Sequence, residues 1–439
     1  MSNQYISIDQ AIEKVELANK IFQQNKNDYQ NRPKDKIRKV GKVLLERKYE
    51  FAKVISSEMG KPVYESLAEI EKSALNCDFY ADNCDEFLKD RFYSTERYDA
   101  IVRNEPLGVI LGIMPWNFPF WQVFRFAVPT ILAGNTIVVK HASNVPQSAH
   151  LIEEIFLEAG FEAGTYLNLS LKSDDVEAVI ENPMIKAVSL TGSEKAGSSV
   201  ASIAGKNIKK SVLELGGSNA FIVMNDADLD NIMEKAMNAR FRNAGQSCIA
   251  AKRYLIQDGI YDEFLKRFTE RVKALKMGDP FDPETQIGPL AREDLAIDLE
   301  KQVNKSIAMG AQLITGGKRN GAFYEPTILT EVTSDMPVFI EETFGPVAAI
   351  KKFKTFDEAI ELSNETTFGL GVSILGENVE EYAAKAHLFE EGAVFFNQLV
   401  RSDPKLPFGG VKRSGFGREL SIDGIHEFVN VKTIVRSKV

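Results

Sequence analysis

The chain has 439 residues, 44% of them hydrophobic, which is enough apolar material for two or three domains with separate cores. Its formal net charge is -9 and it contains no dense lysine or arginine run, so we expect no binding to nucleic acid. The first ten residues lack the basic and apolar regions of a secretory signal, and the longest apolar stretches are too short to cross a bilayer. We therefore expect no membrane partner.

Helices are expected at the N-terminus. Apolar residues recur at helical spacing over 8–21, directly after Ser7, which is a suitable N-cap. The pattern predicts one further helix over 35–60 that ends at Gly60. Residues 91–106 are rich in strand formers and predict an exposed hairpin.

From residue 108 onward, short apolar strands alternate with amphipathic helices. The strands are expected at 108–114, 136–141, 165–171, 186–192 and 211–215. Such alternation predicts a parallel sheet covered on both faces. A second α/β series begins near Phe221 and runs to about Gly417. Residues 428–439 alternate like a strand, without an evident partner nearby in the sequence.

The three cysteines, Cys77, Cys84 and Cys248, form no C-x-x-C pair. A disulfide framework is therefore not expected, and a reducing, cytoplasmic location fits best. Cys77 and Cys84 lie two turns apart in a predicted helix, where a free thiol usually packs as a small hydrophobe. Cys248 differs, because it lies between a glycine turn and an apolar run. The four histidines show no metal-ligand spacing, so we expect no metal site.

Three short motifs could carry chemistry, and each also has a purely structural interpretation. TGSEKAG (191–197) follows a strand and opens a helix, where backbone N–H groups can bind a pyrophosphate, or where the chain simply turns. LELGGSN places Glu214 at a strand end beside two glycines. PWNFP places Asn117 in a proline-bounded turn, where its amide could donate to an oxyanion or stabilise the turn.

Together with AGNTIVVK, GQSC, EETFGP and PFGGVKRSGFGRE, these motifs resemble the aldehyde dehydrogenase superfamily in order and approximate spacing. The resemblance covers nearly the whole chain and is greatest for bacterial NAD(P)-dependent succinate-semialdehyde dehydrogenases. The Asn-Pro-Ala-Thr-Gly stretch that usually precedes the first helix in the family is missing from this sequence.

The resemblance implies the α/β aldehyde dehydrogenase fold. A Rossmann-like dinucleotide-binding domain is expected over 1–90 and 106–219, and an α/β catalytic domain over 220–418. A small β oligomerisation element is expected over 91–105 and 419–439, which would pair the two strands left without partners. A homodimer or homotetramer is implied.

The resemblance also implies a mechanism. Cys248 matches the nucleophile that attacks the aldehyde carbonyl. Asn117 and the backbone N–H of Cys248 match the oxyanion-hole donors. Glu214 matches the residue that activates water for hydrolysis of the resulting thioester. Its presence favours a hydrolytic enzyme over a relative that passes the acyl group to coenzyme A.

A cofactor, NAD or NADP, is implied by further matches. Lys140 resembles the residue that binds the adenosine ribose, Ser193 a pyrophosphate contact, and Glu342 the residue that holds the nicotinamide ribose. NAD-preferring relatives often carry glutamate at the position of Ser143, where a carboxylate would repel a 2′-phosphate, so NADP should be tolerated. The remaining matched cofactor contacts are Ile113, Trp116, Gly192 and Phe344.

The substrate expected from the resemblance is succinic semialdehyde, whose distal carboxylate needs a fixed cation. Arg125 and Arg242 match arginines that bind this carboxylate in some succinate-semialdehyde dehydrogenases, and a surface or interdomain ion pair is the alternative. Ser402 and its neighbours would form the pocket rim. A broad-specificity aldehyde dehydrogenase and a non-catalytic descendant of the family are the competing hypotheses.

Overall fold

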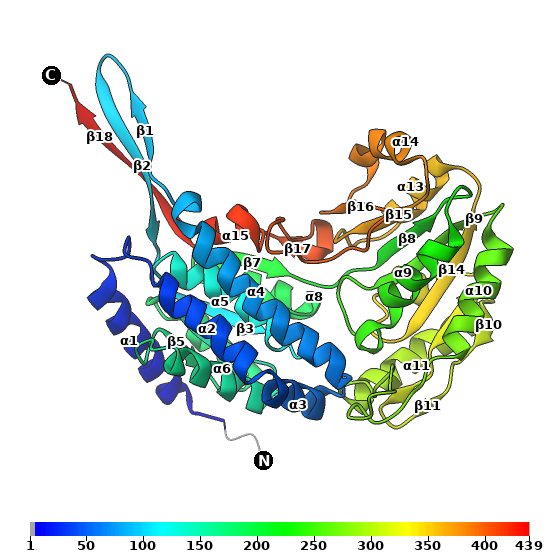
Figure 1. Cartoon of the computed structure of the whole chain (residues 1–439). Coiled ribbons are helices and arrows are strands. Elements are labelled where there is room, and N and C mark those ends of the chain that lie inside the picture. The colour runs from blue at the N-terminus through cyan, green and yellow to red at the C-terminus, as the bar shows by residue number, and fades with distance from the viewer. Residues whose placement is uncertain (1–4, 439) are drawn as a thin grey trace.

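The computed structural model describes residues 5–438. A six-stranded sheet with the order β17-β7-β6-β3-β4-β5 forms the centre of its first domain. The chain runs outward from β3 to β5 and then returns to the other side of β3, so the strand order reverses between β3 and β6. Figure 1 shows this domain, coloured blue to green, beside the second domain. Open α/β sheets bind ligands at the carboxyl ends of strands at such a point. The parallel strands are β3 (Val109–Met114), β4 (Thr136–His141), β5 (Tyr166–Asn168), β6 (Ile185–Thr191) and β7 (Lys210–Glu214).

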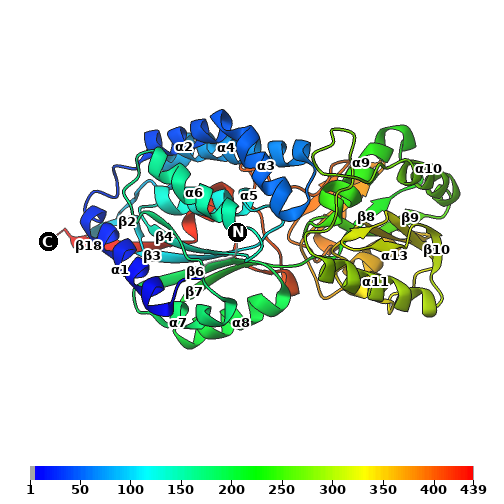
Figure 2. The same ribbon diagram turned by 90° about the horizontal axis from the view of Figure 1, so that it is seen from below.

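Helices cover both faces of this sheet (Figure 2). One face packs against α2 (Lys34–Glu46), α3 (Lys48–Met59), α4 (Val63–Phe87), α5 (Trp121–Leu132) and α6 (Pro146–Glu158). The other face packs against α1 (Ile8–Asn25), α7 (Val176–Glu181) and α8 (Glu194–Lys206). Ser7 caps α1 as predicted, and its hydroxyl accepts the backbone N–H of Gln10.

The prediction of a single helix over 35–60 is wrong, because the structure has two helices there. Helix α2 ends at Arg47, whose backbone leaves the helical region at φ -104° and ψ 16°. No proline or glycine marks the break in the sequence; instead the Arg47 guanidinium reaches Glu158 on α6, 2.8 Å away. Gly60 does end α3, in the left-handed conformation with φ 75°. The strand predicted over 165–171 is also shorter, ending at Asn168.

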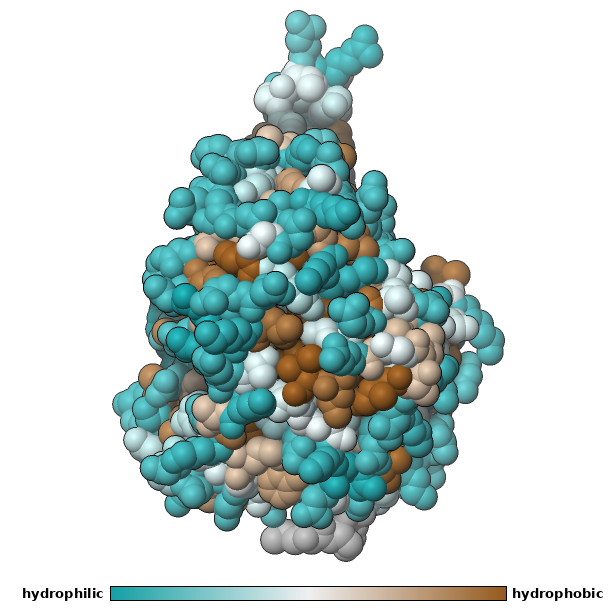
Figure 3. Space-filling model, turned by 90° about the vertical axis from the view of Figure 1, so that its right-hand side faces the viewer, coloured by the Kyte–Doolittle hydropathy of each residue, from teal (hydrophilic) through white to brown (hydrophobic). Residues whose placement is uncertain are grey.

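A seven-stranded sheet with the order β10-β13-β14-β9-β8-β15-β16 forms the second domain. Its strands are β8 (Asn219–Val223), β9 (Ala251–Gln257), β10 (Gln312–Thr315), β13 (Thr327–Thr330), β14 (Val347–Phe353), β15 (Val372–Leu375) and β16 (Val394–Phe396). Its helices are α9 (Leu229–Phe241), α10 (Tyr261–Lys273), α11 (Glu293–Ala308), α12 (Pro337–Ile340), α13 (Phe356–Asn364) and α14 (Val379–Ala384). A small hairpin joins β11 (Arg319–Asn320) to β12 (Phe323–Tyr324). The side of the molecule that carries α10 presents mainly hydrophilic side chains, with apolar ones gathered near its middle (Figure 3).

A three-stranded sheet projects from the first domain (Figure 1). It contains β1 (Arg91–Ser94), β2 (Tyr98–Pro106) and β18 (Val429–Ser437), in the order β1-β2-β18. Strand β18 pairs with β2 along its whole length, from Val429 opposite Pro106 to Ser437 opposite Tyr98. The hairpin and the final strand, both predicted from residue patterns, are therefore partners.

Between the second domain and β18 the chain returns to the first domain. Strand β17 (Gly415–Phe416) pairs antiparallel with β7, and α15 (Ser421–His426) packs against α4 and α5. This return begins before residue 418, where the second domain was expected to end.

Cys77 and Cys84 are buried in α4, and all three cysteines are free thiols. Over residues 5–438, no helix combines the length and apolar character that crossing a membrane requires. Within the same residues, no three histidine, cysteine or acidic side chains are grouped as metal ligands would be.

Candidate active site

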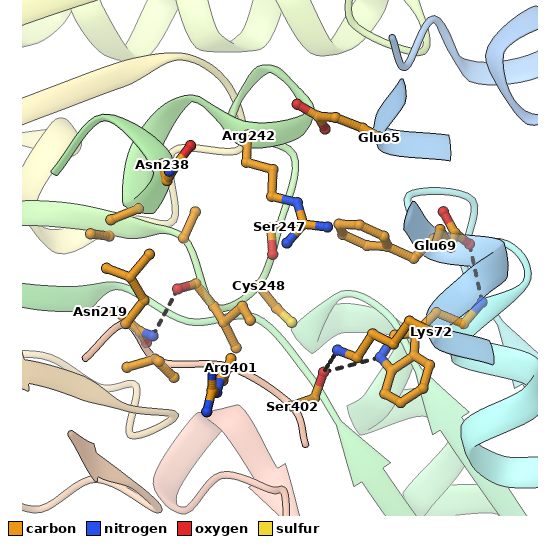
Figure 4. Close-up of a pocket in the computed structure, with 18 of the residues that line it drawn as sticks. Glu65, Glu69, Lys72, Asn219, Asn238, Arg242, Ser247, Cys248, Arg401 and Ser402 are labelled. Atoms are coloured by element: carbon orange, nitrogen blue, oxygen red, sulfur yellow. Dashed lines mark hydrogen bonds between the residues drawn. The ribbon is translucent and has the colours of Figure 1, made fainter. Parts of the chain in front are cut away.

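The candidate site lies where the first sheet meets the second domain. Glu214 is the last residue of β7, and the chain then crosses to β8 in the other sheet. Asn117 follows β3, and Cys248 lies in the loop between α9 and β9. A cavity of about 520 Å³ is lined by Cys248 and by five basic side chains: Lys72, Arg125, Lys235, Arg242 and Arg401. Figure 4 shows Cys248 in this cavity with Lys72, Arg242 and Arg401.

An unusual backbone turn presents Cys248. Asn243, Ala244 and Gly245 all adopt positive φ angles, of 54°, 49° and 75°. Two of the three are not glycine, so the turn persists only because its surroundings fix it. The Glu65 carboxylate accepts the backbone N–H of Asn243 at 2.7 Å. On the other side, the buried Arg240 guanidinium donates to the carbonyl of Gly245 at 2.7 Å.

Lys252 fixes the other end of the same loop. Its buried ammonium donates to the carbonyls of Ser247, at 2.9 Å, and Cys248, at 2.8 Å. The same group lies 3.3 Å from Glu342. Lys252 therefore links the loop that carries the thiol to the residue predicted to hold the nicotinamide ribose.

Ionisation of the Cys248 thiol to the thiolate is disfavoured in the free protein. Burial raises the pKa of Cys248 to about 11, although the cations of Arg125 and Lys252 oppose this effect. Among the described residues, no acceptor meets the backbone N–H of Cys248. That N–H is therefore free to donate, which the predicted oxyanion-hole role requires.

Asn117 is tied to the cysteine loop by reciprocal hydrogen bonds. Its side-chain amide donates to the carbonyl of Gln246 at 3.2 Å, and its own carbonyl accepts from the side chain of Asn243 at 3.0 Å. Asn117 is buried. It therefore lies close to the cysteine loop, and a small rotation of its amide would redirect the N–H toward a reacting carbonyl oxygen.

Glu214 is buried, and among the described residues no group donates a hydrogen bond to its Oε1. Burial and, secondarily, the nearby carboxylate of Glu419 raise its pKa well above the usual range, against the opposing charge of Arg125. Gly409 leaves room for this carboxyl, since a Cβ there would lie 2.7 Å from Oε1. A raised pKa makes the carboxylate of Glu214 a stronger base, which suits a general base.

The predicted cofactor residues gather at the carboxyl ends of β3, β4 and β6. Ile113 lies beside Lys140 in the strand register. The Lys140 ammonium donates to Ser173 at 3.3 Å and, among the described residues, has no carboxylate within 4 Å. Gly192 and Ser193 join β6 to α8, where Ser193 is the N-cap and accepts the backbone N–H of Ala196 at 3.3 Å. Ser143 lies in the turn after β4, three residues beyond Lys140.

The remaining cofactor candidates are Glu342, Trp116 and Phe344. Glu342 accepts the backbone N–H of Gly217 at 3.0 Å, and a Cβ on Gly216 would lie only 2.4 Å from its other oxygen. Gly216 is therefore needed for Glu342 to reach this position. The rings of Trp116 and Phe344 meet edge to face, with centroids 5.7 Å apart.

The two predicted substrate arginines differ in their surroundings. Arg125 is only 1% exposed and forms an ion pair with Glu419. Its guanidinium also donates to Thr191 at 3.3 Å and lies over the ring of Phe408. Arg242 is exposed and, among the described residues, has no carboxylate within 4 Å. Both line the cavity, but Arg125 is also engaged in a buried ion pair within the first domain, whereas the predicted alternative was a surface or interdomain pair.

A family model described as "Aldehyde dehydrogenase family" matches residues 3–434. The chain belongs to the aldehyde dehydrogenase family. It is 47% identical to a probable NADP(+) succinate-semialdehyde dehydrogenase of Synechocystis, an alignment that covers 96% of this chain and 93% of the relative. It is also 47% identical to the Escherichia coli succinate semialdehyde dehydrogenase [NAD(P)+] Sad, over 92% of this chain and 88% of that one.

Solved structures agree with this assignment. The crystal structure of succinic semialdehyde dehydrogenase from Streptococcus pyogenes, in complex with NADP+, is 39% identical. It superposes with a TM-score of 0.95 and covers 98% of this chain and 96% of that one. The chain thus has the aldehyde dehydrogenase fold that its motifs predicted.

Sequence reasoning missed the residues that support the site. Glu65, Arg240 and Lys252 hold the cysteine loop. Lys72 lines the cavity, and Ser173 accepts a hydrogen bond from Lys140. Arg240 and Lys252 lie within a few residues of the family motif GQSC, so a charged side chain in an otherwise apolar stretch was an available signal. Glu65 and Lys72 lie far from this motif in the sequence, on a helix with many other charged residues, and gave no signal of their role.

Proposed function

We propose that this chain oxidises succinic semialdehyde to succinate with NADP or NAD. The observation that carries the proposal is the cavity itself, which combines the thiol of Cys248 with five basic side chains: Lys72, Arg125, Lys235, Arg242 and Arg401. An aldehyde with a distal carboxylate fits such a cavity, because the anion meets the cations while the carbonyl reaches the thiol. The names of the most similar relatives support the same substrate.

The first step is attack by the Cys248 thiolate on the aldehyde carbon. The sulfur–carbon bond forms as the carbonyl double bond opens, and the negative charge moves to oxygen. The backbone N–H of Cys248 and the side-chain amide of Asn117 stabilise that oxygen. The thiohemiacetal anion that results carries the hydrogen to be removed as hydride.

The residues that would hold the cofactor fit an anionic dinucleotide. Lys140 is a partly buried cation with no carboxylate partner among the described residues, and burial alone lowers its pKa. Such a group is stabilised by a phosphate or by ribose hydroxyls. Gly192 and Ser193 directly precede the 13-residue helix α8, whose first backbone N–H groups can donate to a pyrophosphate. When bound, NADP or NAD supplies the hydride acceptor.

Hydrolysis of the thioester is assigned to Glu214. As a carboxylate it takes a proton from water, and the hydroxide equivalent adds to the thioester carbon. The carbon–sulfur bond then breaks and returns Cys248 as a thiolate, with succinate as the product. The unmet oxygen of Glu214 supports this role.

The proposed substrate is tested by absorbance at 340 nm with succinic semialdehyde and with butanal, using either cofactor. The ratio of kcat/KM for the two aldehydes should be about 100 or more, because butanal has no carboxylate for the cationic cavity. Arg242→Met should lower this ratio about threefold to tenfold, a modest effect because Arg242 is exposed. A wild-type ratio near one would instead establish the broad-specificity alternative.

The non-catalytic alternative is tested by Cys248→Ala. This variant should lose oxidation of every aldehyde while it still binds NADP, measured by quenching of tryptophan fluorescence. A wild-type protein that binds NADP but reduces none with either aldehyde would be a binding descendant of the family.

We also infer that the sheet β1-β2-β18 pairs with a second copy of the chain. Its exposed side chains include Phe92, 74% exposed, and Val435, 58% exposed, together with Tyr93 and Val431. Apolar side chains gathered on one projecting sheet are typical of an interface. Light scattering on a sizing column should show a dimer or tetramer, and Phe92→Asp with Val435→Asp should shift it to smaller species. A monomer in the wild type would contradict the inference. A cytoplasmic location remains a prediction from the cysteine content.

A further inference from the structure

Lys252 holds the two peptide units that flank Cys248. Its ammonium donates to the carbonyl of Ser247 at 2.9 Å and to the carbonyl of Cys248 at 2.8 Å. These carbonyls belong to the peptide units on either side of the Cys248 Cα, and both residues line the cavity (Figure 4). One side chain therefore fixes the backbone before and after the nucleophile.

The carbonyl of Ser247 and the backbone N–H of Cys248 are parts of the same peptide unit. This unit is trans and planar, so the two groups point in opposite directions. An ammonium that holds the carbonyl therefore directs the N–H away from itself. Since no group among the described residues accepts that N–H, it is left to donate to a ligand.

The positive charge of Lys252 also makes this N–H a stronger donor. A hydrogen bond to a carbonyl oxygen draws electrons toward that oxygen and polarises the N–H of the same peptide, more so where the dielectric constant is low. The Ser247 carbonyl also accepts the backbone N–H of Ala250 at 3.2 Å, which acts in the same direction. That donor is neutral, however, so the ammonium has the larger influence.

A charged side chain is costly at this position. Lys252 is fully buried, and burial lowers the pKa of Lys252 to about 8, with a smaller contribution from Arg240 and against the opposing charge of Glu342. Glu342, at 3.3 Å, is the one carboxylate within 4 Å among the described residues. A neutral donor would satisfy the same carbonyls at a lower cost, so the charge itself is expected to have a function.

We propose that Lys252 is a positioning residue for oxyanion stabilisation. It fixes and polarises the N–H of Cys248, so that this group donates strongly to the oxygen that becomes negative as sulfur bonds to the aldehyde carbon. Lys252 acts through the peptide between Ser247 and Cys248, without contact with the substrate. The proposal rests on the thiol attack proposed above. Because every aldehyde develops the same oxyanion, Lys252 should assist acidic and neutral aldehydes equally.

The experiment compares two reactions of the same thiol. Attack on an aldehyde, followed by kcat/KM, creates an oxyanion, whereas alkylation of the free protein by iodoacetamide creates none. Lys252→Met should slow alkylation, because the cation lowers the thiol pKa, but should lower kcat/KM about tenfold to 30-fold more than that. The additional factor should be the same for succinic semialdehyde and butanal. Lys252→Gln keeps N–H donors without the charge and should lie between the wild type and Lys252→Met.

Lys209→Met is the matched control. The Lys209 ammonium also donates to two backbone carbonyls, those of Ile180 and Asn182. It lies directly before β7, at the opposite end of that strand from Glu214. Its loss should change neither reaction more than about twofold, because it is remote from the cysteine loop.

Binding of NADP, measured by quenching of tryptophan fluorescence, reports whether Lys252→Met is folded. Its Kd should rise no more than about threefold, because Glu342 keeps its hydrogen bond from Gly217. Equal losses in alkylation and in kcat/KM would overturn the proposal, since Lys252 would then act on the thiol alone. A loss confined to NADP affinity would also overturn it, because Lys252 would then act through Glu342. A wild-type protein that oxidises neither aldehyde would instead overturn the proposed function.

Discussion

The ammonium of Lys61 lies 2.5 Å from the carboxylate of Glu69, and neither side chain is exposed to solvent. The other oxygen of Glu69 accepts the backbone N–H groups of Phe120 and Trp121, at 2.8 and 3.0 Å. These N–H groups are at the start of α5, where no intrahelical acceptor exists. One buried carboxylate on α4 thus neutralises a cation and fixes the segment that follows Asn117.

Glu69→Gln should therefore destabilise the protein strongly. The substitution leaves Lys61 as an unpaired buried charge, which costs about 3–5 kcal/mol. Thermal unfolding followed by circular dichroism should show a clearly lower Tm. Asp85→Asn is the matched control, since its partner Lys34 is also 2.5 Å away but both side chains are solvent-exposed. The Tm of that variant should barely move, and an equal loss in both would contradict the reasoning.

The pKa of Cys248 predicts how the free enzyme reacts with iodoacetamide. With the pKa raised to about 11 by burial, alkylation should accelerate about tenfold per pH unit between pH 7 and 10, because only the thiolate reacts. Lys252→Met should slow the reaction at a given pH, since this cation lowers the thiol pKa. Cys248→Ala should label very slowly, because Cys77 and Cys84 are buried. A rate that is flat from pH 7 to 10 would show that the thiol is already ionised.

Deacylation should depend on the ionisation of Glu214. Because the carboxylate is the active base, the rate should rise as the pH passes upward through its raised pKa. Glu419→Gln removes a neighbouring negative charge that raises this pKa and frees Arg125, which lowers it. Both changes shift the rise to lower pH. Steady-state rates between pH 5 and 9 measure the shift, and a movement to higher pH would contradict it.

The variant Glu214→Gln separates this step from hydride transfer. Rapid mixing should show a burst of reduced cofactor followed by a slow steady state, since the thioester forms but is not hydrolysed. An unchanged steady-state rate would exclude Glu214 as the base.

Cofactor choice should respond to Ser143. Ser143→Glu places a carboxylate three residues beyond Lys140, where it would repel a 2′-phosphate. The KM for NADP should rise at least about tenfold, while the KM for NAD should change little. Equal losses for both cofactors would mean that Ser143 does not face the ribose.

The sequence predicted the path of the first sheet well, because strands such as 109–114 and 136–141 have apolar centres and are bounded by turns. It failed at Arg47, where the helix breaks without a proline or glycine and the guanidinium pairs with Glu158, a residue more than a hundred positions away. The same limit applies to the site. Cys248 and Glu214 lie in motifs that can be read directly, whereas Glu65 and Lys72 act only because α4 packs beside the loops they contact. The ion pair of Arg125 with Glu419 likewise joins residues whose proximity no local pattern encodes.

The return of the chain to the first domain determines when the site can be assembled during synthesis. β17, α15 and β18 complete the first domain, yet all three follow the entire second domain in the sequence. On the ribosome, the strand that bears Glu214 emerges with an open edge, and Arg125 emerges without the carboxylate that will neutralise it. A domain usually folds as its residues emerge, but this one must wait for almost the whole chain. A ribosome that stalls within the second domain would therefore release a protein that carries the thiol of Cys248 without a completed hydrolytic site.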